Sequence, residues 1–315
     1  MSTKDLVKTQ SVKELFSKST TVSRQIWGKF LYEGDLGVLF GDSNTGKTIL
    51  ANDIAFFACG GGHEWPGMVP PNTPTMYIDM EMTGEQYARR YRNAMDYMTD
   101  SFQRAEVNVL MSAESRIFPA LRTEIIHQQG TKNPPKFIII DNITNGFGSI
   151  FSASKMRELT SELKMLKDRF GLTILLVAHC PKRKPNTPIT DNSLGGSKMI
   201  INFCDSAFAI GQSQLNPETK YVKQIKTRAD EKMSDVMTVR ISTEPYLCMQ
   251  YVGMVDEDAH INPKNEDLWL SEITPEKEIE LVRLLTDGEK SYSEISNILS
   301  IKRDIVVDYA IKNIL

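Results

Sequence analysis

The chain has 315 residues, of which 41% are hydrophobic and 24% charged, and its formal net charge is -3 at pH 7. These values are typical of a globular protein with room for one large and one small domain. They exclude a strong positive field around the whole molecule, so any nucleic acid would have to be held by local basic loops.

The cysteines and histidines exclude two further classes of protein. The four cysteines show no C-x-x-C spacing and the four histidines form no metal pattern, which argues against a disulfide framework and against zinc. No apolar run has the length of a signal-peptide core or of a membrane span. We therefore expect a cytoplasmic protein without a membrane segment.

Residues 1–30 are mostly polar, and their pattern predicts an N-terminal arm with one short helix. Val12, Leu15 and Phe16 would form the apolar side of that helix, and Trp27 stands near the end of the arm. Two interpretations stay open. The arm is either a frayed terminus whose tryptophan packs on the core, or a segment that docks on a neighbouring subunit.

The motif that organises the chain is a glycine loop, Gly41-Asp42-Ser43-Asn44-Thr45-Gly46-Lys47-Thr48, which fits the phosphate-binding pattern G-x-x-x-x-G-K-[ST]. An apolar run over residues 36–40 predicts a strand before it, and residues 48–59, with Ile49 in the first turn, predict a helix after it. In such a loop the backbone N–H groups surround the phosphates, Lys47 reaches the β- and γ-phosphates, and the Thr48 hydroxyl holds Mg²⁺. The sequence predicts an ATP site at residues 41–49.

A second strand is expected over residues 75–81, and it ends in two acids. Alternation places Asp79 and Glu81 on one face, near the carboxyl end of the strand, where ligands of parallel sheets bind. We assign Glu81 as the general base that aligns water on the γ-phosphate, with Asp79 as the reserve. The competing interpretation is that Glu81 only caps the helix that follows.

Residues 137–141, Phe-Ile-Ile-Ile-Asp, predict a fully buried parallel strand that ends in an acid. This is the Walker B pattern. Together with the glycine loop upstream, it predicts that Asp141 holds the Mg²⁺ shell opposite Thr48.

Residues 172–178 predict another buried strand, which ends at His179. A polar side chain at this strand tip can touch both the γ-phosphate and the next loop, so His179 is a candidate sensor of nucleotide state. The alternative is a hydrogen-bonded surface histidine.

Residues 180–198 form a long polar loop with four cations, which are Lys182, Arg183, Lys184 and Lys198. Loops of this length are uncommon unless they bind a ligand or are disordered. We assign the four cations to contact with a nucleic-acid backbone, against the alternative of a solvated charge run.

The remaining elements are expected in three groups. Helices are predicted at 86–98, 121–129 and 155–169, and a short strand at 107–111. Strands at 206–210, 220–227, 236–242 and 246–252 predict an antiparallel extension of the sheet. Lys226 and Arg228 lie at the end of the second of these, and they are either surface charges or fingers that reach another subunit's nucleotide.

The end of the chain predicts a separate small module. Residues 256–273 are charged and irregular and are expected to be a linker, and 274–315 show three helical patterns with helix-turn-helix spacing. Residues 275–315 carry more acidic than basic side chains, so contact with protein or with another subunit is favoured over contact with DNA.

Taken in order, the glycine loop, Glu81, Asp141, His179, the basic loop and Lys226-Thr227-Arg228 resemble the RecA-like ATPases, over residues 31–255. The most similar branch is the hexameric replicative helicases of plasmids and mobile elements, of the RepA and DnaB type. That resemblance implies an α/β fold with a mostly parallel sheet, catalysis by Glu81, a histidine sensor at 179, and Lys226 and Arg228 acting across a subunit interface.

The resemblance also implies partners. Loops 143–154 and 180–198 match the positions that hold single-stranded DNA in a central channel, with Phe147 and Phe151 as the available aromatic side chains. We expect a ring-forming, Mg²⁺-dependent ATPase that acts as a helicase, with DNA and replication or mobile-element proteins as partners. The alternative is an ATP-switched regulator or helicase loader that binds DNA or protein through its C-terminal module without unwinding.

Overall fold

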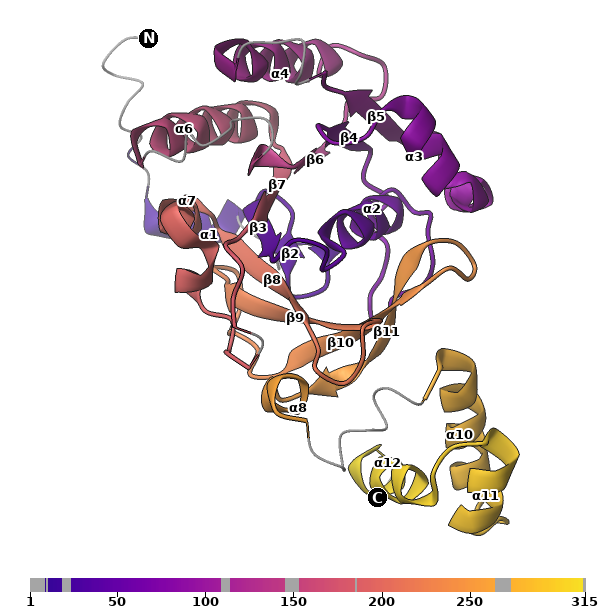
Figure 1. Cartoon of the computed structure of the whole chain (residues 1–315). Helices are drawn as coiled ribbons and strands as arrows, with labels where there is room; N and C mark the ends of the chain where they lie inside the picture. Colours follow the sequence, from indigo (N-terminus) through magenta and orange to yellow (C-terminus); the bar gives the residue numbers. More distant parts are fainter. Residues whose placement is uncertain are drawn as a thin grey trace.

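The computed structural model describes residues 9, 11–18, 24–108, 114–144, 153–184, 186–263 and 273–313. A sheet of nine strands runs through the molecule in the order β11-β10-β9-β8-β3-β7-β6-β4-β5, and a two-stranded sheet, β1-β2, accompanies it. Helices cover both faces of the large sheet (Figure 1). This is the α/β architecture that the resemblance implies.

The strands in chain order are β1 Gln25–Trp27, β2 Leu31–Tyr32, β3 Leu36–Gly41, β4 Thr75–Asp79, β5 Phe102–Glu106, β6 Phe137–Asp141, β7 Thr173–His179, β8 Ser206–Gln212, β9 Thr219–Lys226, β10 Val236–Ser242 and β11 Cys248–Val255. The helices are α1 Val12–Lys18, α2 Lys47–Ala58, α3 Gly84–Arg90, η2 Arg92–Tyr97, α4 Glu114–Gln128, α6 Ala153–Phe170, η4 Asp191–Ser197, α7 Lys198–Phe203, α8 Asp258–Ile261, α10 Pro275–Asp287, α11 Tyr292–Leu299 and α12 Arg303–Asn313.

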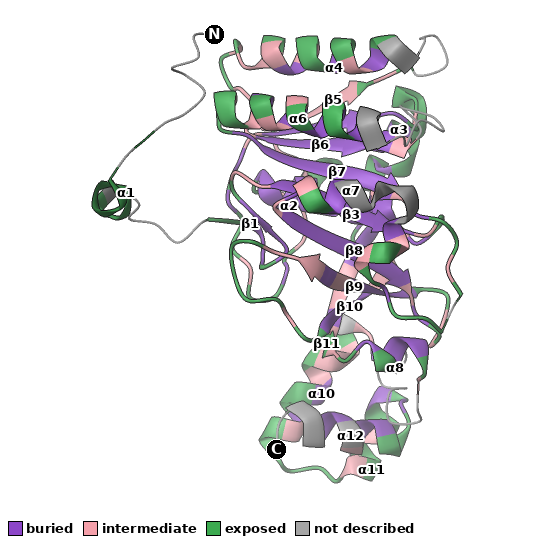
Figure 2. Ribbon diagram, turned by 90° about the vertical axis from the view of Figure 1, so that its left-hand side faces the viewer, coloured by how far each residue is buried: buried purple, intermediate pink, exposed green. Residues whose placement is uncertain are grey.

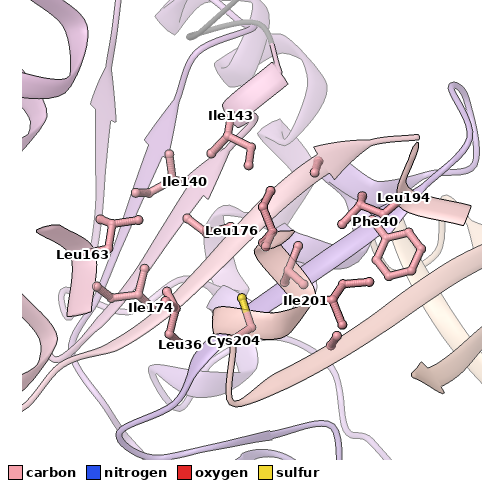
Figure 3. Packing of buried hydrophobic residues seen from close by; sticks show 14 of the residues in the cluster. Leu36, Phe40, Ile140, Ile143, Leu163, Ile174, Leu176, Leu194, Ile201 and Cys204 are labelled. Atoms are coloured by element: carbon pink, nitrogen blue, oxygen red, sulfur yellow. The ribbon is translucent and has the colours of Figure 1, made fainter. Parts of the chain in front are cut away.

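The central strands are parallel because both of their faces are apolar and both must be covered. Every residue of β3 and β6 is buried. Alternate residues of β3 point to opposite sides, so Val38 packs with α4, α6 and α7, whereas Leu39 packs with α2. Figure 3 shows the first of these two cores, where Leu163 of α6 and Ile201 of α7 lie near Ile140 and Leu176 of the sheet.

The parallel register brings the carboxyl ends of neighbouring strands to one edge of the sheet. Gly41 of β3 pairs with His179 of β7, Asp141 of β6 pairs with Val177 of β7, and Asp79 of β4 pairs with Asp141. The residues that follow these strands therefore gather at the same edge.

The second half of the sheet is antiparallel, as the sequence predicts. β9 pairs antiparallel with β8 and β10, and β10 pairs antiparallel with β11. One strand was placed wrongly from the sequence. The edge strand is 102–106 rather than 107–111, because its side chains are only half-buried and its apolar signal is weak.

The packed core begins before residue 31, so the arm is shorter than the expected 1–30. Trp27 is fully buried, with ring centroids 4.7 Å from Phe30, 5.1 Å from Trp65 and 5.6 Å from Phe208. The tryptophan thus packs on the core, as one of the two interpretations has it. Helix α1 is exposed, and Figure 2 draws it away from the sheet.

Residues 256–263 are packed rather than irregular, in contrast to the expected linker. The turn of α8 buries His260 completely because the imidazole finds Thr238 Oγ1 at 2.9 Å and Ser213 Oγ at 3.0 Å. Its ring also stacks on Tyr221, with centroids 4.8 Å apart. The rest of the expected linker, 264–272, lies outside the described residues.

Helices α10, α11 and α12 form a small module with its own apolar core, including Leu281, Ile295 and Val306. Val252 of β11 belongs to the same cluster and joins the module to the edge of the sheet. Three helices are therefore present where the sequence predicts them, while their assignment as a helix-turn-helix stays a prediction. Among the described residues, no helix is both long and apolar enough to cross a lipid bilayer.

Candidate nucleotide-binding site

The glycine loop lies between β3 and α2, where its two glycines are required by space and by backbone conformation. A Cβ on Gly41 would lie 2.4 Å from the Ile210 carbonyl oxygen, and one on Gly46 would lie 2.3 Å from the Met249 side chain. Gly46 also has φ +90°, which L side chains rarely adopt. Helix α2 then begins at Lys47 with no side-chain cap from Gly46, so its first N–H groups point at the loop.

Other residues of the loop stabilise its shape. The Thr45 hydroxyl donates to the Asp42 carbonyl oxygen over 2.9 Å, and Asn44 takes a left-handed conformation with φ +63°. Ser43 and Asn44 are exposed, whereas Ile49 is buried in the α2 core. Residues 41–48 thus form the ordered loop expected to bind phosphate, and Ile49 contributes packing.

Lys47 is directed into the loop. The residue is only 4% exposed, and its Nζ donates to the carbonyl oxygens of Gly41 at 3.0 Å and Asp42 at 2.7 Å. Burial lowers the pKa of the ammonium group, while the nearby carboxylates raise it. The ammonium group is therefore positioned among the backbone groups that surround a bound phosphate.

Asp141 and Thr48 provide oxygen ligands suited to Mg²⁺. Asp141 is 2% exposed, and its Oδ2 accepts a hydrogen bond from the Tyr77 hydroxyl. Its Oδ1 is buried and accepts no hydrogen bond among the described residues. Burial raises the pKa of Asp141 to about 6, and hydrogen bonds from Tyr77 and Thr48 oppose that effect. A buried carboxylate beside the Thr48 hydroxyl is a set of oxygen donors that fits a hard cation.

Three strand tips bring Glu81, Asn142 and His179 together. The Asn142 amide donates to Glu81 Oε1 and its Nδ2 lies 2.9 Å from His179 Nε2, while His179 Nε2 lies 3.3 Å from Glu81 Oε1. The hydrogen bond from His179 lowers the pKa of Glu81, against the opposing effect of burial. Glu81 therefore stays ionised at neutral pH, as a base must.

Asp79, the reserve candidate for the base, is engaged in a different role. It is 1% exposed, and its Oδ1 accepts from the N–H groups of Glu81 and Met82, both at 2.9 Å. Its Oδ2 accepts from the Arg104 guanidinium at 2.9 Å. Asp79 thus shapes the turn that carries Glu81, and only Glu81 of the two carboxylates lies in the strand-tip cluster.

Three residues of the site escaped the sequence analysis. They are Asn142, Tyr77 and Arg104, which contact Glu81, Asp141 and Asp79 respectively. Asn142 had a usable signal, since it directly follows the Walker B aspartate. Tyr77 and Arg104 had none, because their partners lie on neighbouring strands rather than nearby in sequence.

The four cations of the expected basic loop occupy different environments, and the loop is shorter than predicted because η4 covers Asp191–Ser197 and Lys198 begins α7. Lys182 and Lys184 are exposed, whereas the Arg183 side chain is only 13% exposed and its Nε lies 3.5 Å from Asp42 Oδ1. The side chain of Lys198 lies outside the described residues, as do Phe147 and Phe151 of the other expected channel loop.

Lys226 and Arg228 lie far from the glycine loop of their own chain. Lys226 pairs with Ala207 at the amino end of β8, whereas the glycine loop follows the carboxyl end of β3, which is parallel to β8. Lys226 Nζ donates to the Ile201 carbonyl at 2.6 Å, and Arg228 Nη1 to Asp205 Oδ1 at 2.9 Å. Within one chain, the pair cannot reach the phosphates that the loop would hold.

A comparison with protein-family models finds one match, which is described as an AAA domain and covers residues 3–185. A search among curated protein sequences finds no match.

Solved structures give a similar picture of the fold. A KaiC-like protein from the hyperthermophilic archaeon Pyrococcus horikoshii OT3 superposes with a TM-score of 0.52 at 15% identity, over 71% of this chain and 91% of that one. The flagellar accessory protein FlaH from Methanocaldococcus jannaschii gives a TM-score of 0.46 at 14% identity, over 73% of this chain and 92% of that one. The first comparison supports a RecA-like fold.

Proposed function

Because the chain belongs to the AAA-domain family, we propose that it is an ATP-hydrolysing motor that forms a ring, associates with single-stranded DNA and acts as a helicase. The observation that carries the hydrolytic part is the strand-tip cluster of Glu81, Asn142 and His179 beside the glycine loop. A binding protein that never cleaves ATP has no need of an ionised carboxylate held at that position.

The residues divide the chemistry of hydrolysis among them. The loop amides and Lys47 bind the phosphates and offset the charge that develops on them. Glu81 orients the attacking water and accepts its proton, while Asn142 and His179 hold the carboxylate in place. Mg²⁺, held by Thr48 and Asp141 when bound, would neutralise charge between the β- and γ-phosphates.

The position of Lys226 and Arg228 supports a composite site. The two cations lie at the end of the sheet opposite the glycine loop, and in a ring of head-to-tail copies they would face the nucleotide of a neighbour. In that arrangement, one subunit would bind ATP and the next would supply the positive charge that stabilises the transition state. We propose a hexamer on the basis of the resemblance to replicative helicases.

The test of the enzyme is the rate of phosphate release by purified protein with Mg²⁺. We expect ATP hydrolysis that single-stranded DNA stimulates, and at least a hundredfold loss in Lys47→Ala, because a group in contact with the transferred phosphate is removed. A Lys47→Ala variant with the parent's rate would refute ATP hydrolysis at this loop.

A second candidate function is an ATP-switched regulator or helicase loader, favoured by the separate C-terminal module of α10, α11 and α12. Strand separation distinguishes the two. The motor should displace a labelled strand from a forked duplex in the presence of ATP, whereas the regulator should hydrolyse ATP without displacing it. ATPase stimulation by DNA without any unwinding would favour the regulator.

A further inference from the structure

Arg183 differs from its neighbours in the basic loop because its guanidinium points inward. Nη1 donates to the Thr187 carbonyl oxygen at 3.0 Å, and Nε lies 3.5 Å from the Asp42 carboxylate. The lysines on either side, Lys182 and Lys184, are exposed. A side chain that is 13% exposed has little surface to offer to a nucleic-acid backbone.

Asp42 is the second residue of the glycine loop, so its carboxylate belongs to the segment whose backbone would surround the phosphates. The Cys180 thiol donates to Asp42 Oδ1 over 3.1 Å, and Lys47 Nζ donates to the Asp42 carbonyl oxygen. The Asp42 side chain is 20% exposed, so water screens its negative charge only in part. The glycine loop, which would bind anionic phosphates, therefore carries a negative charge of its own.

The charges around the loop are unfavourable for an anion unless Asp42 is compensated. The carboxylates of Asp42, Glu81 and Asp141 all lie near enough to Lys47 to act on its charge. A nucleoside triphosphate would add several negative charges to these three carboxylates. Repulsion between like charges would then weaken its binding. The guanidinium of Arg183 is the group placed against Asp42.

We propose that Arg183 is a positioning residue for nucleotide binding, whose guanidinium neutralises Asp42 so that the glycine loop can accept the phosphates. This inference rests on the proposed binding of ATP at that loop. It reassigns Arg183 from nucleic-acid contact to the nucleotide site, and it leaves Lys182 and Lys184 to contact nucleic acid.

The basic loop is also attached to the rest of the chain at two points. Arg183 contacts Asp42 at one end, and at the other the Ile189 N–H donates to Glu257 Oε1 over 2.8 Å. The Tyr221 hydroxyl lies between these points and hydrogen-bonds with both Arg183 and Glu257. Because the exposed Lys184 lies between these two attachments, the Asp42–Arg183 pair would couple nucleotide binding to nucleic-acid binding, and each would affect the other equally.

The test is a double-mutant cycle on nucleotide affinity, measured by calorimetry with Mg²⁺ and a non-hydrolysable ATP analogue in the absence of DNA. Arg183→Ala should weaken binding on the order of tenfold, because it leaves Asp42 uncompensated. Asp42→Asn together with Arg183→Ala should return the affinity to within about twofold of Asp42→Asn alone. Arg92→Ala is a matched control that removes a guanidinium from an exposed position of η2, and it should leave the affinity unchanged.

Three results would overturn the proposal. Arg183→Ala could keep the parent's nucleotide affinity, the loss of affinity could persist when Asp42 is also neutral, or the Arg92→Ala control could lose as much. If Arg183→Ala does not fold, Arg183→Lys and Arg183→Gln replace it. Arg183→Lys should keep the nucleotide affinity and Arg183→Gln should lose it. Equal nucleotide affinities of these two variants would contradict the proposal. Failure of the parent itself to bind the analogue would refute the proposed function instead.

Discussion

At the scale of single residues, the site depends on side chains that hold other side chains in place. Asn142 and His179 surround the Glu81 carboxylate, and Asp79 holds the turn on which Glu81 stands. The hydrogen bond from His179 lowers the pKa of Glu81. Catalytic groups need such support because a small displacement from the productive geometry removes much of the rate.

Glu81→Gln tests the base directly. The amide keeps the size of the side chain but cannot accept the proton of water, so we expect hydrolysis to fall by roughly a hundredfold or more while nucleotide affinity stays near that of the parent. Phosphate release and calorimetry measure the two quantities. A variant that still hydrolyses ATP at the parent's rate would assign the base to another group.

The raised pKa of Asp141, about 6, predicts how Mg²⁺ binding depends on pH. Below that value the carboxyl group carries a proton that Mg²⁺ must displace, so Mg²⁺ affinity should fall by about tenfold for each pH unit. Since phosphate groups titrate in the same range, Asp141→Asn is the control, and its residual pH dependence belongs to the nucleotide. Equal slopes in titrations of parent and variant between pH 5 and about pH 7 would contradict the assignment.

At the scale of elements, apolar strands build the sheet and polar strand ends build the site. β6 is buried along its whole length and ends in Asp141, and β7 is buried up to His179. Edge elements follow this rule less well, because a half-buried strand such as β5 shows little apolar pattern. The same weakness explains why β1, with its buried Trp27, was expected to be part of the arm.

Trp27→Ala tests the place of β1 in the core. Removing this fully buried ring should lower the free energy of unfolding by about 3–5 kcal/mol, since the cavity is lined by Phe30, Trp65 and Phe208. Deleting residues 1–23 should cost far less, because α1 is exposed. Denaturant unfolding of both variants measures the difference, and equal losses would mean that the arm also stabilises the core.

His260 predicts the pH dependence of the stability of the sheet. Burial lowers its pKa to about 4, below the value of about 6.5 for an unfolded chain. The unfolded state therefore binds more protons between these values, and stability falls as the pH drops from about 6.5 to 4, by up to about 3 kcal/mol.

The measurement is the free energy of unfolding of the parent and of His260→Gln across this pH range. The variant lacks the titrating ring, so its stability should depend less on pH than that of the parent. If the two curves run parallel, the stability loss has another origin.

At the scale of the whole molecule, the proposed composite site would combine residues of two subunits. The glycine loop and the Lys226–Arg228 pair lie at opposite ends of parallel strands, so a complete site of the kind we propose needs two copies. In the present chain, Lys226 and Arg228 bond to the carbonyl groups that end α7 and to Asp205. A neighbour's nucleotide would compete for these cations.

Mixing two inactive variants tests the shared site. Lys47→Ala destroys the phosphate site of one subunit, and Arg228→Ala removes the cation that the next subunit supplies. Mixed rings should recover part of the ATPase activity, because some interfaces combine an intact loop with an intact cation. Absence of recovery in rings that contain both variants, or a particle mass of one chain in the presence of ATP, would contradict the composite site.

The sequence by itself determined the glycine loop, the acid that ends β6 and the order of the central strands along the chain. These features depend on local spacing, since a loop motif, an apolar run and the acid that ends it are read within a few residues.

Only the tertiary structure decided which of these groups meet. Glu81 and His179 are far apart in sequence, but Glu81 Oε1 lies 3.3 Å from His179 Nε2. The strand order and the parallel register bring the ends of β4 and β7 to one edge of the sheet. It also decided that Arg183 faces Asp42 while Lys182 and Lys184 face water. Neighbouring cations in a loop look alike in sequence, and packing against the rest of the chain separates them.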